Sequence, residues 1–258
     1  MKKKKSQKIS LVLGGGGARG FFHVGVIKAL KELNVEIIEI SGASIGALIG
    51  ALYAINPDFD FEKLLDDIDF LSITKILKGE GLTSTKKIYE KVRKLIPNKR
   101  FSSLKIPLRF VTNDINTGEE IIFDKGTLYP GLFASFAIPG VFPLVKWRKR
   151  LLCDGGLTND VPVDLVKGKK IIISDIRIQK NNISANTSRV HILKNTFLIP
   201  REILQKIKNK KALKNKSFVE LSFHKHHHIF DFRKEKLENM IQIGYEETMK
   251  QKKKILNL

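Results

Sequence analysis

The chain has 258 residues, of which 42% are hydrophobic and 28% are charged, and this ordinary balance excludes a wholly disordered protein. Its apolar runs are far shorter than the roughly 20 residues that cross a bilayer, so no transmembrane helix is expected. The formal net charge of +21 leaves two alternatives: an anionic membrane as partner, met by clusters such as Lys2–Lys5 and Arg148–Arg150, or a composition that is simply rich in lysine. No nucleic-acid-binding signature is present, so no nucleic-acid partner is expected.

The two ends of the chain both carry lysine runs. We expect residues 1–7 and 251–258 to be solvated basic tails around a single domain at residues 8–250. The apolar stretch behind the first lysines is too short for a signal peptide, and Cys153 is the only cysteine. These features predict a cytoplasmic protein, with peripheral contact at the inner membrane face as the membrane alternative.

The first elements alternate between strands and helices. Residues Lys8–Leu13 predict a buried strand, and apolar residues that recur every three or four positions predict a helix over Phe21–Leu33. A second strand is expected over Val35–Ile40 and a second helix over Ala47–Ile55. This order predicts an α/β fold with a central, mainly parallel sheet and helices on both faces.

The rest of the chain continues in the same style. The further strands that we expect are Leu108–Asn113, Glu120–Asp124, Leu144–Cys153 with a basic hairpin tip, and Lys170–Ile176. The further helices that we expect are Phe61–Pro97, broken near Gly79–Gly81, then Gly131–Ala137, Val190–Lys214 and Phe232–Lys253, with a polar loop at Asn181–Ser188.

The four glycines Gly14–Gly17 follow the first strand and admit two interpretations. Gly15-x-Gly17-x-x-Gly20 satisfies the dinucleotide-binding pattern, with Glu36 or Glu39 as the acidic partner, so the chain could be a nucleotide-binding module. The same backbone amides could instead form an oxyanion hole for acyl transfer. That second interpretation needs a nucleophile on the same edge of the sheet.

A serine stands at that edge, between the second strand and the second helix. In Gly42-Ala43-Ser44-Ile45-Gly46, the glycine two residues to each side permits a turn that is too tight for side chains. Such a nucleophile elbow exposes the Ser44 hydroxyl at the carboxyl edge of the sheet and points the amino end of a helix at it. An ordinary turn is the alternative.

Asp154 ends the strand Leu144–Cys153 and is followed by Gly155 and Gly156. A carboxylate in this place could accept the serine proton as a general base, although Asp-Gly is also a common turn pair. The alternative base is a histidine of a Ser-His-Asp triad, either His191 or a member of His224–His228. We otherwise expect His224–His228 to be an exposed basic loop rather than a metal site.

Taken in order, these motifs resemble the patatin-like phospholipase family. The resemblance covers about residues 8–176, and its blocks are Leu11–Gly20 with His23–Val26, Ser41–Ala47, Ala137–Pro143 and Asp154–Val163. The stretch Gly244–Glu246 is also similar to small bacterial members. Joint occurrence of these blocks is far more specific than any one of them.

The resemblance implies a patatin-like fold and a serine–aspartate dyad that hydrolyses fatty-acyl esters of phospholipids or related lipids without a metal or cofactor. Ser44 would be acylated, and Asp154 would take its proton and later activate water. The oxyanion would be held by the loop of Gly15, Gly16 and Gly17, braced by Arg19. The glycines of the elbow and the dyad loop would be Gly42, Gly46, Gly155 and Gly156.

The sequence departs from the family pattern in two places. Asp160 stands where many members have asparagine, and Leu144 stands where many have a second proline. Both positions lie outside the dyad, so the departures bear on substrate detail rather than on the chemistry.

Overall fold

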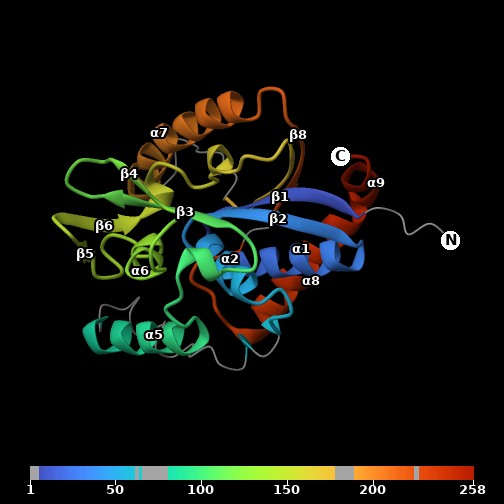
Figure 1. Cartoon of the computed structure of the whole chain (residues 1–258). Coiled ribbons are helices and arrows are strands. Elements are labelled where there is room, and N and C mark those ends of the chain that lie inside the picture. The colour runs from blue at the N-terminus through green and yellow to red at the C-terminus, as the bar shows by residue number, and fades with distance from the viewer. Residues whose placement is uncertain (1–5, 62–63, 66–80, 178–188, 224–226) are drawn as a thin grey trace.

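The computed structural model describes residues 6–61, 64–65, 81–177, 189–223 and 227–258 (Figure 1). Its centre is one sheet of eight strands in the order β5-β6-β3-β2-β1-β7-β8, with β4 also paired to β3. The strands are β1 (Gln7–Leu13), β2 (Val35–Gly42), β3 (Leu108–Asp114), β4 (Glu120–Phe123), β5 (Val145–Trp147), β6 (Arg150–Asp154), β7 (Lys170–Asp175) and β8 (Ser217–Ser222).

The middle of the sheet is parallel and one side of it is antiparallel. Strand β1 pairs in parallel with β2 and β7, and the parallel region extends to β3 on one side and β8 on the other. Strands β4 and β6 both pair antiparallel with β3, and β5 pairs antiparallel with β6. The predicted mainly parallel sheet is therefore confirmed.

Helices cover both faces of the sheet, as predicted (Figure 1). Helices α1 (Phe21–Glu32), α2 (Ile45–Ile55) and α8 (Lys234–Lys250) lie on one face, and α7 (Arg189–Ala212) lies on the other. The remaining helices are α5 (Gly81–Leu95), α6 (Gly131–Ser135) and α9 (Lys252–Leu256), besides short 3-10 turns such as Gly155–Leu157. None of the helices within the described residues is long and apolar enough to cross a membrane.

Most expected elements occur within a few residues of their predicted bounds, but not all. Strand β8 was not expected, and the helix predicted over Phe232–Lys253 is divided at Gln251. Of the helix expected over Phe61–Pro97, the structure describes α5, while residues 66–80 lie outside the described residues. The expected loop at Asn181–Ser188 and the cluster Lys2–Lys5 also lie outside them.

The end of the chain differs from the expected solvated tail at residues 251–258. Helix α9 forms there, Ile255 is fully buried, and the Gln7 side chain donates a hydrogen bond to the Leu258 carbonyl at 2.7 Å. The lysines at residues 252–254 are exposed, and this charged run is the reason that the sequence predicted a solvated tail. Burial of Ile255, which contributes about 1.5–3 kcal/mol, helps to anchor the last helix, and Leu258 also packs against the core.

Helices α1 and α8 pack against each other through glycine. A Cβ atom at Gly25 would overlap the Ile241 carbonyl, and one at Gly244 would overlap the Phe22 carbonyl. The two backbones therefore approach too closely for even a methyl group. This contact fixes α8 over the same face of the sheet as α1.

We expect Gly244→Ala to destabilise the protein by about 1–3 kcal/mol, because the overlap with backbone outweighs the roughly 1 kcal/mol that alanine gains in a helix. Urea unfolding followed by circular dichroism measures the change. Gln242→Ala, at an exposed position of the same helix, is the control and should stay within about 0.5 kcal/mol of wild type. An unchanged or raised stability of Gly244→Ala would contradict the close approach of the two helices.

Candidate active site

The ends of three strands bring the predicted residues to one edge of the sheet. Leu13 at the end of β1 lies opposite Gly42 at the end of β2, so the glycine loop and the serine turn leave the sheet side by side. Gly42 in turn lies opposite Phe110 of β3, and Asp154 at the end of β6 lies opposite Thr112. Asp154 therefore lies two residues along β3 from the position opposite the end of β2, at the same edge of the sheet as the serine turn.

The turn at Ser44 is sharp and strained. Ser44 has φ 51° and ψ −124°, a conformation that non-glycine residues rarely adopt, and α2 begins at the next residue. A Cβ at Gly42 would lie 2.7 Å from the backbone of Gly46, and one at Gly46 would overlap the Leu13 carbonyl. Both glycines are therefore required by close packing around the turn.

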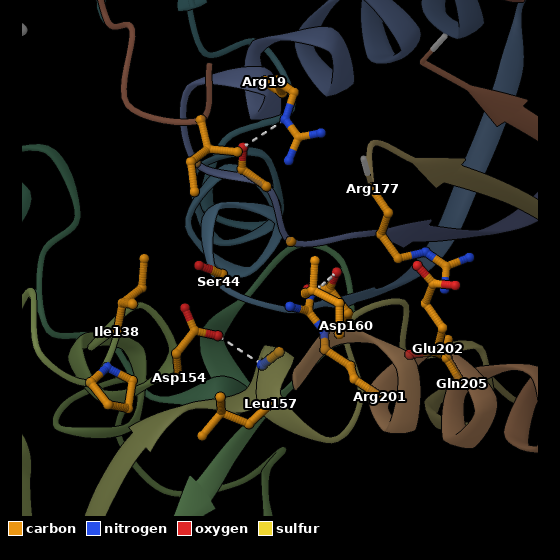
Figure 2. A pocket seen from close by; sticks show the side chains of 17 residues that line it. Arg19, Ser44, Ile138, Asp154, Leu157, Asp160, Arg177, Arg201, Glu202 and Gln205 are labelled. Carbon is orange, nitrogen blue, oxygen red and sulfur yellow. Dashed lines mark hydrogen bonds and ion pairs between the residues drawn. The ribbon is translucent and has the colours of Figure 1, made fainter. Parts of the chain in front are cut away.

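Asp154 is buried, with 6% of its surface exposed, and its carboxylate points toward Ser44 (Figure 2). One carboxylate oxygen accepts a hydrogen bond from the Gly156 amide at 2.7 Å. Burial raises the pKa of Asp154 to about 7, although its interactions with the Ser44 hydroxyl and the Gly156 amide act to lower it. A carboxyl group with this pKa can both accept and return a proton near neutral pH.

The glycine loop offers fewer amide donors than the sequence suggested. The amide of Gly15 already donates to the Asp160 carbonyl at 2.9 Å, so it is not available to an oxyanion. Within the described residues, the amides of Gly16 and Gly17 make no backbone hydrogen bond. Of the three glycines expected to form an oxyanion hole, Gly15 is therefore excluded as a free amide donor in this structure, and Gly16 and Gly17 remain candidates.

Arg19 lies under this loop and is 4% exposed. Its Nε donates to the Gly16 carbonyl at 3.4 Å. Burial lowers the pKa of Arg19 to about 10, so the side chain remains a cation at neutral pH. The bracing role that the resemblance implies for Arg19 stays a prediction.

His23 also supports the loop and is fully buried. Its Nε2 donates to the Gly14 carbonyl at 2.8 Å, because that oxygen can only accept, and its Nδ1 then accepts from the Ser174 hydroxyl at 2.7 Å. Burial lowers the pKa of His23 to about 4 and keeps it neutral. The imidazole therefore joins the ends of β1 and β7 rather than serving as a base.

Asp160 lines the same cavity as Ser44 and Asp154, and the sequence did not predict this placement. It is 3% exposed and forms an ion pair with Arg201 of α7. A Cβ at Gly15 would overlap its carboxylate, and one at Gly156 would lie 2.6 Å from it. Burial raises the pKa of Asp160 while Arg201 lowers it, and its charge in turn raises the pKa of Asp154. The only sequence signal was the departure from asparagine.

A cavity opens in front of Ser44 and Asp154 (Figure 2). Its apolar wall consists of Ile138, Pro139, Leu157, Leu198 and Ile229. Its polar wall includes three arginines, Arg19, Arg177 and Arg201, and Arg177 is held in an ion pair by Asp175. The cavity is thus lined by both apolar and charged side chains.

The alternative bases and ligands do not reach this cavity in the described part of the chain. No histidine is among the described residues that line it, and His227 instead contacts the Asp231 carbonyl at 3.1 Å. His191 lies in α7, but its side chain, like His224 and His226, is outside what the structure describes. No group of three or more His, Cys, Asp and Glu side chains within the described residues is arranged to hold a metal.

Glu39, one of the two acidic residues that could serve a dinucleotide site, makes its hydrogen bonds and ion pair within the protein. The Glu39 carboxylate accepts hydrogen bonds from the Ser10 hydroxyl at 2.7 Å and the Gly168 amide at 2.6 Å, and it pairs with Arg109 at 2.8 Å. Glu36 bonds to Ser6 at 3.2 Å at the other end of β2. This arrangement counts against a ribose-binding role for either residue.

The family profile of patatin-like phospholipases matches residues 11–167, more than half of the chain. The chain belongs to the patatin-like phospholipase family. The match includes the glycine loop, Ser44, Asp154 and Asp160, whereas Arg177 and Arg201 lie beyond it.

Individual relatives agree with the family assignment. An uncharacterized NTE family protein of Mycobacterium tuberculosis is 32% identical over 188 residues, which are 71% of this chain and 52% of that protein. The human patatin-like phospholipase domain-containing protein 6 is 33% identical over 178 residues, or 64% of this chain and 13% of that protein. The chain thus spans about half the length of the mycobacterial relatives.

The patatin-like fold is also seen in a solved structure. VipD from Legionella pneumophila aligns with a TM-score of 0.52 and 14% identity, over 97% of this chain and 67% of that one. At this identity the likeness concerns the fold alone.

The raised pKa of Asp154 has a consequence for stability. Between its unfolded value near 4 and its folded value of about 7, the folded state holds a proton that the unfolded state has lost. The folded state is therefore favoured by this group at low pH, and that contribution is lost as pH rises through about 7.

We expect Asp154→Asn to stabilise the protein relative to wild type at pH 8, by up to about 4 kcal/mol, and to do so much less near pH 4. Urea unfolding at both pH values measures this. Asp124→Asn, at an exposed carboxylate, is the matched control and should change little at either pH. If the stabilisation by Asp154→Asn does not grow with pH, the pKa of the Asp154 carboxyl is not raised in the folded protein.

Proposed function

We propose that the protein is a lipid acyl hydrolase that cleaves fatty-acyl ester bonds of phospholipids or related lipids through Ser44 and Asp154. The observation that carries the proposal is the buried Asp154 carboxylate, whose pKa is about 7, facing the serine of a strained turn. Membership of the patatin-like phospholipase family supports the substrate class. The apolar wall of the cavity, with Leu157 and Ile138, suits a fatty-acyl chain.

The first half of the reaction forms an acyl-enzyme. The Ser44 oxygen attacks the ester carbonyl carbon while its proton passes to Asp154. The negative oxygen of the tetrahedral intermediate accepts hydrogen bonds from the amides of Gly16 and Gly17. When the bond to the alcohol breaks, the leaving oxygen takes the proton back from Asp154 and the acyl group remains on Ser44.

The second half releases the fatty acid. Water attacks the acyl carbon and gives its proton to Asp154, and the same amides hold the oxyanion. The bond to Ser44 then breaks, and the serine oxygen recovers a proton from Asp154. The carboxyl thus returns to its ionised form, and the cycle needs no metal or cofactor.

Asp154 can serve as the base without a histidine because of its environment. An exposed aspartate near pKa 4 is a weak base, whereas a general base works best with a pKa near the working pH. Burial supplies this shift here.

We expect Asp154→Asn to lower hydrolysis of a short-chain soluble ester at least about a hundredfold, because it removes the base directly. Ser44→Ala should abolish hydrolysis and labelling by a fluorophosphonate probe. Initial rates on purified proteins, with near-ultraviolet circular dichroism as the test of folding, measure both.

The control variants are the histidines of the triad alternative. His191→Ala and a combined alanine replacement of His224, His226, His227 and His228 should each keep activity within a few-fold of wild type. In a triad, loss of the histidine is about as damaging as loss of the serine. A folded histidine variant as inactive as Ser44→Ala would therefore overturn the dyad.

A further inference from the structure

Helix α7 has a polar face against the protein. Arg201 forms the ion pair with Asp160, and Lys208 forms one with Glu120 of β4. Between them, Gln205 is 1% exposed and its side chain donates to the Val161 carbonyl at 2.8 Å and accepts from the Val161 amide at 3.1 Å. Residues 201, 205 and 208 have the spacing of one helix face, so this face attaches the part of α7 whose side chains the structure describes to the domain by polar contacts.

The opposite face of α7 is apolar and exposed. Ile199, Ile203 and Ile207 follow one another at four-residue spacing and are 43%, 54% and 61% exposed. Leu204, beside them, is 37% exposed. A surface helix of a globular protein normally shows the reverse, with its apolar stripe against the core. A contiguous exposed stripe of this kind marks an interaction surface.

The charges around this stripe are positive. Lys206, Lys210 and Lys211 are exposed on the same part of the helix, and Glu202 is the only acidic residue in the α7 sequence. The whole chain carries a net charge of +21. Aliphatic residues flanked by lysines are typical of helices that lie in the interface of an anionic membrane, whereas protein interfaces favour aromatic residues and arginine and are depleted in lysine.

The same helix forms a wall of the cavity. Leu198, Arg201, Glu202 and Gln205 line the space in front of Ser44 (Figure 2). Leu157, which also lines it, is 45% exposed. A lipid surface in contact with the outward face of α7 would therefore be separated from the cavity by the thickness of this helix.

We propose that the outward face of α7, formed by Ile199, Ile203, Leu204 and Ile207 with the lysines beside them, binds the headgroup–acyl boundary of an anionic membrane. The purpose of this contact rests on the proposed function, since a membrane presents the lipid ester next to the cavity. The isoleucines enter the boundary and the lysines contact anionic headgroups. The membrane contact is thereby assigned to one helix rather than to the terminal lysines or Arg148–Arg150.

The test is flotation of the full chain with vesicles of phosphatidylcholine alone and of phosphatidylcholine mixed with phosphatidylserine. Binding is measured without turnover in the Ser44→Ala background. The test variant is Ile203→Ser with Ile207→Ser, which removes apolar surface and leaves the charge unchanged. The control is Phe218→Ser of β8 with Leu256→Ser of α9. It removes two other exposed apolar side chains, 45% and 44% exposed, in a region that also carries Lys216 and Lys253.

We expect the Ser44→Ala chain with an unaltered α7 to bind the mixed vesicles, and this binding should weaken as the salt concentration rises. The same chain should bind vesicles of phosphatidylcholine alone only weakly. The α7 double variant should lower the partition coefficient about tenfold or more, as expected for two aliphatic side chains that no longer leave water, while the control double variant keeps it within about twofold. The proposal is overturned if the chain does not bind vesicles, or if the α7 double variant binds them normally. It is also overturned if only the control double variant loses vesicle binding.

Two further measurements separate the other outcomes. In the active chain, the α7 variant should keep soluble-ester hydrolysis near wild type and lose hydrolysis of vesicle lipid. Vesicle binding through α7 without hydrolysis of any ester would refute the proposed function, but it would still support α7 as the membrane-binding surface.

Sedimentation velocity tests whether this face instead binds a second copy of the chain. If the α7 double variant dissociates a dimer and vesicle binding is unchanged, the face binds another chain and the membrane proposal is contradicted.

Discussion

The burial of one carboxylate, that of Asp154, is the interaction on which the site depends. Removal from water raises its pKa to about 7 and so makes an ordinary acid into a base suited to neutral pH. This burial also opposes folding once the group ionises, so the chemistry that we propose is obtained at a loss of stability. The surrounding fold has to compensate, and the parallel strands with their continuous apolar runs do so: Ile9, Leu11 and Leu13 of β1 are fully buried.

The rest of the site follows from how the strands end. Register between β1 and β2 places the glycine loop beside the serine turn, and the antiparallel β6 brings Asp154 back to the same edge. Small residues make this convergence possible, because side chains at Gly15 and Gly156 would collide with the Asp160 carboxylate, and one at Gly46 would collide with the β1 backbone. The buried His23 then holds the loop through Gly14 without taking part in proton transfer.

Local patterns in the sequence were sufficient for the parallel strands β1, β2, β3 and β7, but not for β8, which also pairs in parallel. Apolar runs bounded by glycine predicted β1 and β2, and the strained turn lies where Gly42-x-Ser44-x-Gly46 stands. Contacts between distant segments could not be predicted in this way. The ion pair of Asp160 with Arg201, the capture of the Gly15 amide by the Asp160 carbonyl and the burial of Ile255 all depend on tertiary packing, and no residue spacing encodes them. The outward apolar face of α7 was likewise hidden, since periodicity predicts a helix but not which face meets the protein.

The central claim is that Ser44 carries the acyl group during turnover, and trapping that intermediate tests it most directly. A slow ester substrate is mixed with the full chain, the reaction is quenched in acid within the first turnover, and intact and peptide masses are measured. The account predicts an added mass equal to one acyl group, located on Ser44, that accumulates in wild type and is absent from Ser44→Ala and strongly reduced in Asp154→Asn. Ester hydrolysis with no acyl adduct on Ser44, or with the adduct on another residue, would contradict it.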